Sequence, residues 1–84
     1  MRMSEKKTRR IVERHLFDGH RLRFQESGSA VVVRCIFCGA VPLGSSLSYG
    51  MAFAMWAAAD LTSPGQVRFF GSDGVERENW LPLE

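Results

Sequence analysis

Hydrophobic residues are densest in the segment Ser46–Leu61, in which Asp60 is the one charged residue. Its apolar residues recur at helical spacing, and a serine at position 45 or 46 can cap its start. The sequence Ser63-Pro64-Gly65 follows and is typical of a helix end. The pattern predicts one central α-helix.

Alternating apolar and polar residues on both sides of this helix predict two β-hairpins. The predicted strands are His20–Glu26 with Ala30–Ile36, and Gln66–Phe70 with Val75–Leu81. The first hairpin turns at Ser27-Gly28 and the second at Gly71–Gly74, while the Pro42-containing segment 39–44 is predicted to be a loop.

The register of the first hairpin decides which side chains share a face. A two-residue turn at Ser27-Gly28 pairs Leu22 with Val33 and His20 with Cys35. Because side chains alternate between the faces of a strand, His20 and Cys35 then lie on the same face of the sheet.

The segment Ser4–Phe17 predicts a further helix, with a cap at Ser4 or Thr8 and an end at Gly19. A strand over Arg10–Phe17 that turns at Asp18-Gly19 is the alternative interpretation. We therefore predict a single α+β domain over residues 1–84. Residues 1–19 form a basic N-terminal helix or arm. Residues 20–84 form a ββαββ core, in which one main helix packs on one face of a four-stranded antiparallel sheet.

Charge is distributed unevenly along the chain, whose formal net charge is +2. Residues 1–23 hold an excess of basic side chains, and the remainder holds an excess of acidic ones. The basic end is suited to a phosphate or an acidic protein surface, or else to a solubilising tail. The start of the chain lacks the apolar core of a signal peptide, and the stretch Met51–Ala59 is too short to span a bilayer. We expect a cytoplasmic location and no contact with a membrane.

The central helix has two apolar stripes. One is predicted to lie on the sheet and consists of Leu47, Met51, Ala54, Ala58 and Leu61; the other consists of Tyr49, Phe53, Trp56 and Asp60. Either the N-terminal helix and loops cover the second stripe, or Tyr49, Phe53 and Trp56 form a protein interface or a homodimer seam. For the interface interpretation, Arg9, Arg10 and Arg14 would steer the partner by their charge.

Four residues are candidates for metal binding. Cys35 and Cys38 form a Cys-x-x-Cys motif followed by glycine, and His15 and His20 complete a possible set of zinc ligands. Two buried thiols with surface histidines, and a redox-active pair, are the alternatives. Zinc is the cofactor that this set would take.

Catalytic motifs are not found: the sequence has no nucleophile elbow, no phosphate-binding glycine loop and no metalloprotease helix motif. We therefore expect that the protein is not an enzyme. Arg68, Phe69 and Phe70, together with Arg21 and Arg23, interleave basic with aromatic residues in the way of nucleic-acid-binding surfaces.

The runs Tyr49–Leu61, Val67–Gly74 and Glu78–Trp80 are similar to a family of small bacterial ββαββ proteins of unknown function, and to small phage-encoded anti-CRISPR proteins of the type I-F class. The likeness covers roughly residues 30–84 and leaves out the basic N-terminal segment and the Cys35/Cys38 pair. It implies a stoichiometric inhibitor that covers the surface of a crRNA-guided surveillance complex, and it implies no catalytic residues.

Two functional hypotheses follow. The first is a phage or mobile-element protein that inhibits a bacterial CRISPR-Cas complex by protein–protein binding. The second is a zinc-supported nucleic-acid-binding or regulatory module. In the second hypothesis the phosphate backbone is contacted by Arg9, Arg10, Arg14, Arg21 and Arg23.

Overall fold

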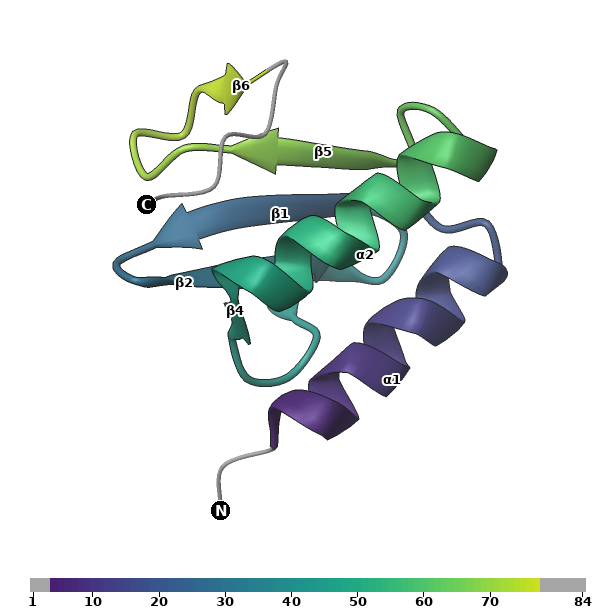
Figure 1. Ribbon diagram of the computed structural model, residues 1–84, viewed down its shortest axis with the longest axis horizontal. Helices are drawn as coiled ribbons and strands as arrows, with labels where there is room; N and C mark the ends of the chain where they lie inside the picture. The colour runs from purple at the N-terminus through teal and green to yellow at the C-terminus, as the bar shows by residue number, and fades with distance from the viewer. Residues whose placement is uncertain (1–3, 78–84) are drawn as a thin grey trace.

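A computed structural model describes residues 4–77 of the chain. Two helices and six strands follow one another in these residues (Figure 1). Their order is α1 (Glu5–Phe17), β1 (Leu22–Ser27), β2 (Ala30–Cys35), β3 (Gly39–Pro42), β4 (Leu47–Ser48), α2 (Tyr49–Thr62), β5 (Val67–Phe70) and β6 (Glu76–Arg77). The α+β class and the N-terminal helix are confirmed.

The sheet is mixed, so the prediction of four antiparallel strands is wrong. Its strands lie in the order β3-β2-β1-β5-β6, and the short strand β4 also pairs with β2. β1 and β5 are parallel, with Leu22 beside Val67 and Phe24 beside Phe69. The reason is visible in Figure 1: α2 crosses the sheet in the direction opposite to β1, so the chain enters β5 at the end where β1 begins. Strands β3 and β4 lie outside the predicted ββαββ pattern.

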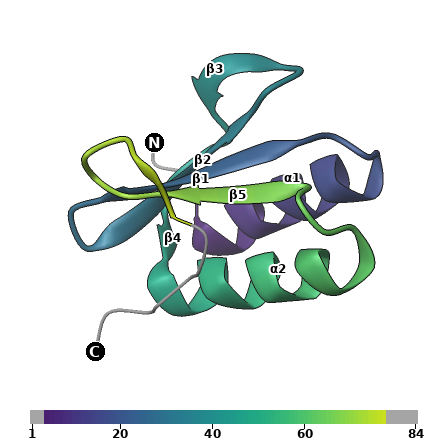
Figure 2. The ribbon, with the colours of Figure 1, turned by 90° about the horizontal axis from the view of Figure 1, so that it is seen from above.

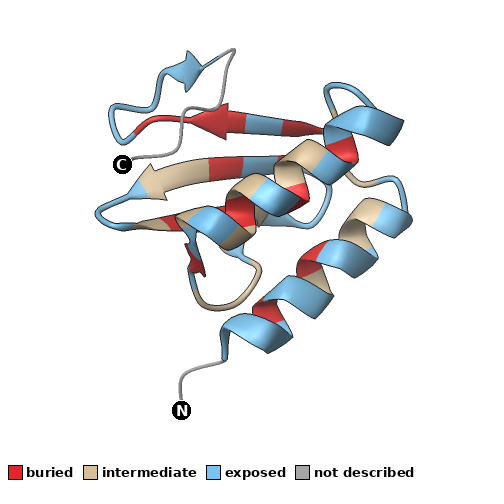
Figure 3. Ribbon diagram, viewed as in Figure 1, coloured by how far each residue is buried: buried red, intermediate tan, exposed pale blue. Residues whose placement is uncertain are grey.

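Both helices cover the same face of the sheet, while the β3 segment turns away on the opposite side (Figure 2). The core lies between the helices and this face, and strands alternate buried and exposed residues along their length (Figure 3). The sheet contributes Leu22, Phe24, Val31, Val33, Cys35, Leu47, Val67 and Phe69, and the helices contribute Val12, Ala52, Met55 and Ala59. A thin, one-sided core is what a chain of 84 residues can build.

The β1–β2 hairpin differs from the predicted register by two residues. Leu22 pairs with Cys35 and Phe24 with Val33, because the turn is made by Gly28 and Ser29. Gly28 has a φ of 62°, which glycine adopts without strain. A shift of two residues leaves every side chain on its predicted face.

Helix α2 begins three residues later than predicted, because Leu47 and Ser48 pair with β2 as strand β4. The hydroxyl of Ser48 caps the helix by accepting a hydrogen bond from the N–H of Met51. A carboxylate oxygen of Glu5, the first residue of α1, accepts a hydrogen bond from the N–H of Ser48 at 2.8 Å. This contact joins the start of α1 to the start of α2.

The predicted sheet-facing stripe of α2 is wrong at three of its positions. Ala54, Ala58 and Leu61 are exposed, and the residues that bury are Ala52, Met55 and Ala59. The helix is apolar almost all round, so the sequence offers no polar side to fix its rotation.

Three further segments can be compared with the predicted elements. Segment 39–44 contains strand β3, which pairs with β2 around a bulge, and is therefore not entirely a loop. Gly71–Gly74 forms the predicted turn, in which the N–H of Gly74 donates to the carbonyl of Gly71. The last predicted strand is present as Glu76–Arg77, and its continuation lies outside the described residues.

No helix in the described part of the chain has both the length and the apolar character needed to cross a membrane.

Candidate metal centre

The C-terminal end of α1 brings two histidines together. Ser4 caps the start of this helix, and its last turn ends at Asp18 and Gly19, where Gly19 takes a φ of 79°. The chain then reverses, and the N–H of His20 donates to the carbonyl of His15 at 3.0 Å. The two imidazole rings meet edge to face with 5.2 Å between their centres. The end of α1 thus presents both rings to the neighbouring strand end.

That strand end carries the two cysteines. Cys35 is the last residue of β2 and is buried, whereas Cys38 is exposed in the tight connection to β3. The N–H of Ile36 donates to the carbonyl of Arg21 at 3.0 Å, which holds this connection against the start of β1. Gly39 follows with a φ of 106°, a value that favours glycine.

The four side chains point at one common position. The Nδ1 atom of His20 lies 3.4 Å from the sulfur of Cys35 and 3.7 Å from that of Cys38, and Nε2 of His15 lies 3.4 Å from the sulfur of Cys38. All four donor atoms lie within 4.8 Å of one another. We call this group of His15, His20, Cys35 and Cys38 the metal corner.

These distances suit a tetrahedral zinc ion. Zn–S and Zn–N bonds of ordinary length place neighbouring ligand atoms about 3.4 to 3.8 Å apart on a tetrahedron. The three printed sulfur–nitrogen separations already fall in that range. All other pairs lie within 4.8 Å, so none needs to contract by more than about 1.4 Å, which side-chain rotation supplies. Two sulfurs and two imidazoles are also a donor set that zinc prefers.

A backbone carbonyl orients His15 for this role. Nδ1 of His15 lies 2.8 Å from the carbonyl oxygen of Ile11, one turn earlier in α1. A carbonyl oxygen only accepts, so Nδ1 carries the hydrogen and the lone pair of Nε2 faces Cys38. An imidazole ligand held by a backbone acceptor through its other nitrogen is a common feature of zinc sites.

Gln66, the residue before β5, makes hydrogen bonds to the chain beside the metal corner. Its side-chain amide donates to the carbonyl of Leu16 at 2.8 Å and to that of His20 at 2.9 Å. The ring of Phe37 packs edge to face against the ring of His20, with 5.4 Å between centres. Gln66 and Phe37 therefore position His20 and its neighbours. The sequence analysis missed Gln66, because no local pattern links it to Leu16 and His20, which lie far earlier in the chain.

The electrostatics of the corner favour a cation over a reactive thiol pair. A hydrogen bond with the adjacent Cys35 sulfur is the main cause of a raised pKa at Cys38, followed by desolvation and then by charge repulsion from Cys35. Two thiolates side by side repel each other, and a bound divalent ion removes that penalty. A redox-active Cys-x-x-Cys has a lowered thiol pKa, commonly at a helix N-terminus. Here the motif follows a strand. The alternative of two buried thiols fits Cys35 alone, because Cys38 is exposed.

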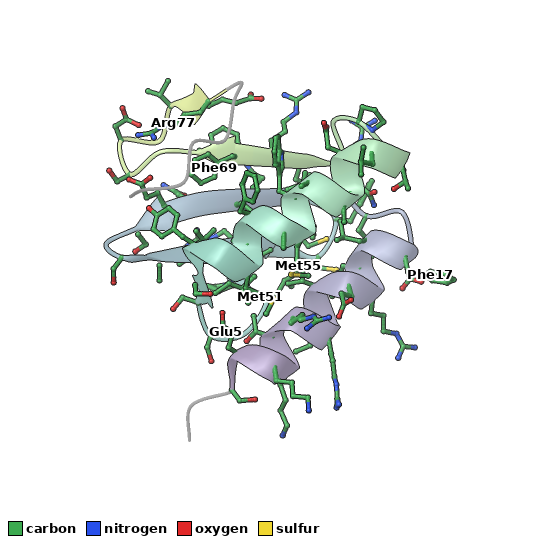
Figure 4. All side chains as sticks on the ribbon, viewed as in Figure 1. Glu5, Phe17, Met51, Met55, Phe69 and Arg77 are labelled. Atoms are coloured by element: carbon green, nitrogen blue, oxygen red, sulfur yellow. The ribbon has the colours of Figure 1, made fainter. Side chains whose placement is uncertain are left out.

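The predicted protein-binding residues lie elsewhere. Tyr49, Phe53 and Trp56 project from one side of α2, where they are half-buried and pack against the core. We call them the aromatic flank. The arginines of α1, Arg9, Arg10 and Arg14, are exposed, and Arg9 forms an ion pair with Glu13 at 3.3 Å. Figure 4 shows the side chains of both helices, with Phe17 pointing away from the molecule at the end of α1.

Comparison of the chain with protein-family models, with curated proteins and with solved structures returns no match. The chain is a small α+β domain with a Cys2His2 cluster compatible with zinc.

Proposed function

We propose that this chain is a non-catalytic zinc-binding domain, in which one structural Zn²⁺ ion at the metal corner fastens α1 to the sheet. The observation that supports it most directly is the convergence of four donor atoms, all within 4.8 Å of one another. The donors come from two separate parts of the chain, residues 15–20 and 35–38. These four residues are all the cysteines and histidines of the sequence, and metal binding explains why they meet at one position.

A structural role follows from the number of ligands. Four protein side chains fill the coordination shell of tetrahedral zinc, whereas catalytic zinc keeps a position open for water or substrate. Within the described residues no carboxylate is part of the cluster to act as a general base. The ion would therefore stabilise the fold and would not take part in a reaction.

The packing of α1 explains why such support is useful. Its fully buried residues are Thr8 and Val12, so the apolar surface that holds the helix to the sheet is small. A structural zinc site contributes its binding free energy to folding, because the unfolded chain does not hold the ligands together. The metal corner would fix the end of α1 that Glu5 and Ser48 do not reach.

Of the two functional hypotheses, the zinc-supported nucleic-acid-binding or regulatory module is the one that this geometry favours. Inhibition of a CRISPR-Cas complex stays a prediction from the resemblance of residues 30–84. The aromatic flank that would carry it packs against the core of its own chain.

Elemental analysis of the purified protein tests the proposal. After refolding with equimolar zinc and gel filtration, we expect one zinc per chain. We expect Cys38→Ser to bind zinc at least about tenfold more weakly, because a thiolate ligand is lost. Cys38 is exposed, so this substitution leaves the core intact.

Ile36→Ser is the matched control, because Ile36 is an exposed residue of the same connection and is not a ligand. It should retain zinc fully. Wild-type protein that folds and leaves the column without zinc would overturn the proposal. Equal retention by Cys38→Ser would do the same.

A further inference from the structure

The sheet face opposite the helices carries a row of three arginines. Arg23 on β1 stands directly beside Arg34 on β2 and beside Arg68 on β5. The neighbours of Arg23 along its strand, Leu22 and Phe24, point to the helix-covered side and are buried. The arginine row therefore lies on the open face. Its existence depends on the parallel pairing of β1 with β5, which the sequence pattern does not reveal.

Such a row concentrates positive charge on one face of the sheet. Neighbouring strands are about 4.8 Å apart, and like charges placed directly opposite each other destabilise a sheet. Arg21 adds a fourth basic side chain, since it lines the same groove as Arg23 and Arg68. Four guanidinium groups gathered on one flat surface point to a ligand with several negative charges.

An aromatic ring lies within this row. The guanidinium carbon of Arg23 is 4.2 Å from the centre of the Phe70 ring, so the guanidinium lies over the ring. Phe69, the preceding residue, is buried on the helix-covered face, as alternation requires. The stacked Arg23 is held in place by Phe70 and presents its outer surface to solvent.

Few acidic residues line this face within the described part of the chain. Two grooves on it are lined by the four arginines, Gln25, Gln66, Phe70 and Glu76, along with apolar and glycine residues. Glu76 is the one acidic residue among those lining them, and it pairs with Arg68 at 3.3 Å, where both side chains are about half exposed. Glu26 belongs to the helix-covered side, where Arg77 approaches it at 3.8 Å. Among the described residues that line these grooves, basic side chains therefore outnumber acidic ones.

We propose that this open face binds single-stranded nucleic acid, with Arg21, Arg23, Arg34 and Arg68 contacting the phosphates. Guanidinium groups bind phosphate oxygens in a bidentate manner, and the planar stack of Arg23 on Phe70 offers a surface on which a base can lie. Flat sheets with arginines and aromatic residues are a recurrent platform for single strands. The described part of this face has no helix that would enter a duplex groove.

The proposed surface is distinct from the metal corner but adjoins it. Arg21 directly follows His20, and Arg34 directly precedes Cys35. Zinc would therefore hold the chain directly beside two of the four arginines, Arg21 and Arg34. The inference goes beyond the proposed zinc-binding function and does not depend on it, because the arginine row is set by strand pairing.

Fluorescence anisotropy with labelled oligo-dT and oligo-U strands tests this inference. A protein that contacts four phosphates of a single strand should show a log–log salt slope of about −3. The double variant Arg23→Gln/Arg68→Gln should bind at least about tenfold more weakly and reduce the slope by about 1.4, because two phosphate contacts are lost.

Lys6→Gln/Lys7→Gln is the matched control: it removes the same charge from the exposed start of α1, at residues with no proposed contact. It should leave the affinity within about twofold, because long-range charge effects are screened at moderate salt. Should circular dichroism show that the sheet variant is unfolded, Arg21→Gln serves instead, since Arg21 lies outside the strands. This variant should lower the slope by about 0.7.

Three outcomes would overturn the inference: equal loss in the α1 control, equal affinity for a duplex of the same length, or equal affinity for a polyglutamate of matched charge. This titration, read beside the zinc content of the same sample, separates the two proposals. A folded chain that binds the single strand but does not take up zinc contradicts the zinc proposal alone. A zinc-loaded chain that binds no single strand contradicts the present inference alone.

Discussion

The metal corner and the aromatic flank of α2 differ in what surrounds their side chains. At the metal corner, four polar donor atoms face one another across less than 4.8 Å. At the aromatic flank, Tyr49, Phe53 and Trp56 already rest against the core, and the rings of Phe53 and Trp56 lie 5.9 Å apart. A half-buried aromatic side chain gains most of its stabilisation inside its own chain. Donors converging on one another gain theirs from a ligand.

Removing the metal should have the largest effect on the stability of the folded chain. When free zinc exceeds its dissociation constant about 1,000-fold, it stabilises the folded chain by about 4 kcal/mol, and a chelator removes this contribution. The loss should concentrate at the end of α1, which we expect to gain amide hydrogen exchange around His15. Chemical denaturation with and without chelator measures the stability change.

The chelator experiment has an internal control in the aromatic flank. Amides in the middle of α2 should keep most of their protection, because their helix packs through Ala52, Met55 and Ala59. Unfolding free energies that are equal with and without chelator would contradict the structural role of the metal.

Shortening an aromatic residue of the flank should have an intermediate effect. Trp56→Ala should lower the free energy of unfolding by about 2 kcal/mol, roughly half the cost of removing a fully buried aromatic side chain. Leu61→Ala, on the same helix but 87% exposed, should change it by less than about 0.5 kcal/mol. Urea denaturation compares the two variants.

The same pair of variants separates packing from recognition. If the flank is a homodimer seam, Trp56→Ala should instead change the molar mass measured by light scattering while leaving the stability of the monomer nearly intact. That result would restore the interface interpretation.

The smallest effect concerns Tyr49, which is the single tyrosine of the chain. Burial, followed by the nearby Glu26 carboxylate, raises the pKa of Tyr49 from 10 to about 12. The folded state thus favours the neutral phenol, and the resulting stability is complete below pH 10 and is lost as the pH rises toward 12. Phenolate absorbance follows this ionisation directly. A midpoint near 10 in the folded protein would mean that the hydroxyl is solvated and that the flank is more open than described.

The metal corner could be predicted from sequence because the prediction tolerated an error. The register of the β1–β2 hairpin differs by two residues from the predicted one, yet Nδ1 of His20 still lies 3.4 Å from the sulfur of Cys35. The approach of His15 follows from the end of α1 at Gly19. The residue types, their shared face and the chain reversal at Gly19 were sufficient to predict the four ligands.

The rotation of α2 and the arginine row could not be predicted for different reasons. Ala54 and Ala58 are as apolar as Ala52 and Ala59, so only packing decides which pair is buried. The placement of Arg68 beside Arg23 requires β5 to return parallel to β1. Which strands become neighbours depends on the path of the intervening helix, and local alternation contains no information about that path.

Zinc K-edge X-ray absorption on the zinc-loaded protein tests the central claim most directly. We predict a first shell of two sulfurs at about 2.3 Å and two nitrogens at about 2.0 Å from the metal. A shell made only of nitrogen and oxygen atoms, with no sulfur contribution, would contradict the assignment of Cys35 and Cys38 as ligands.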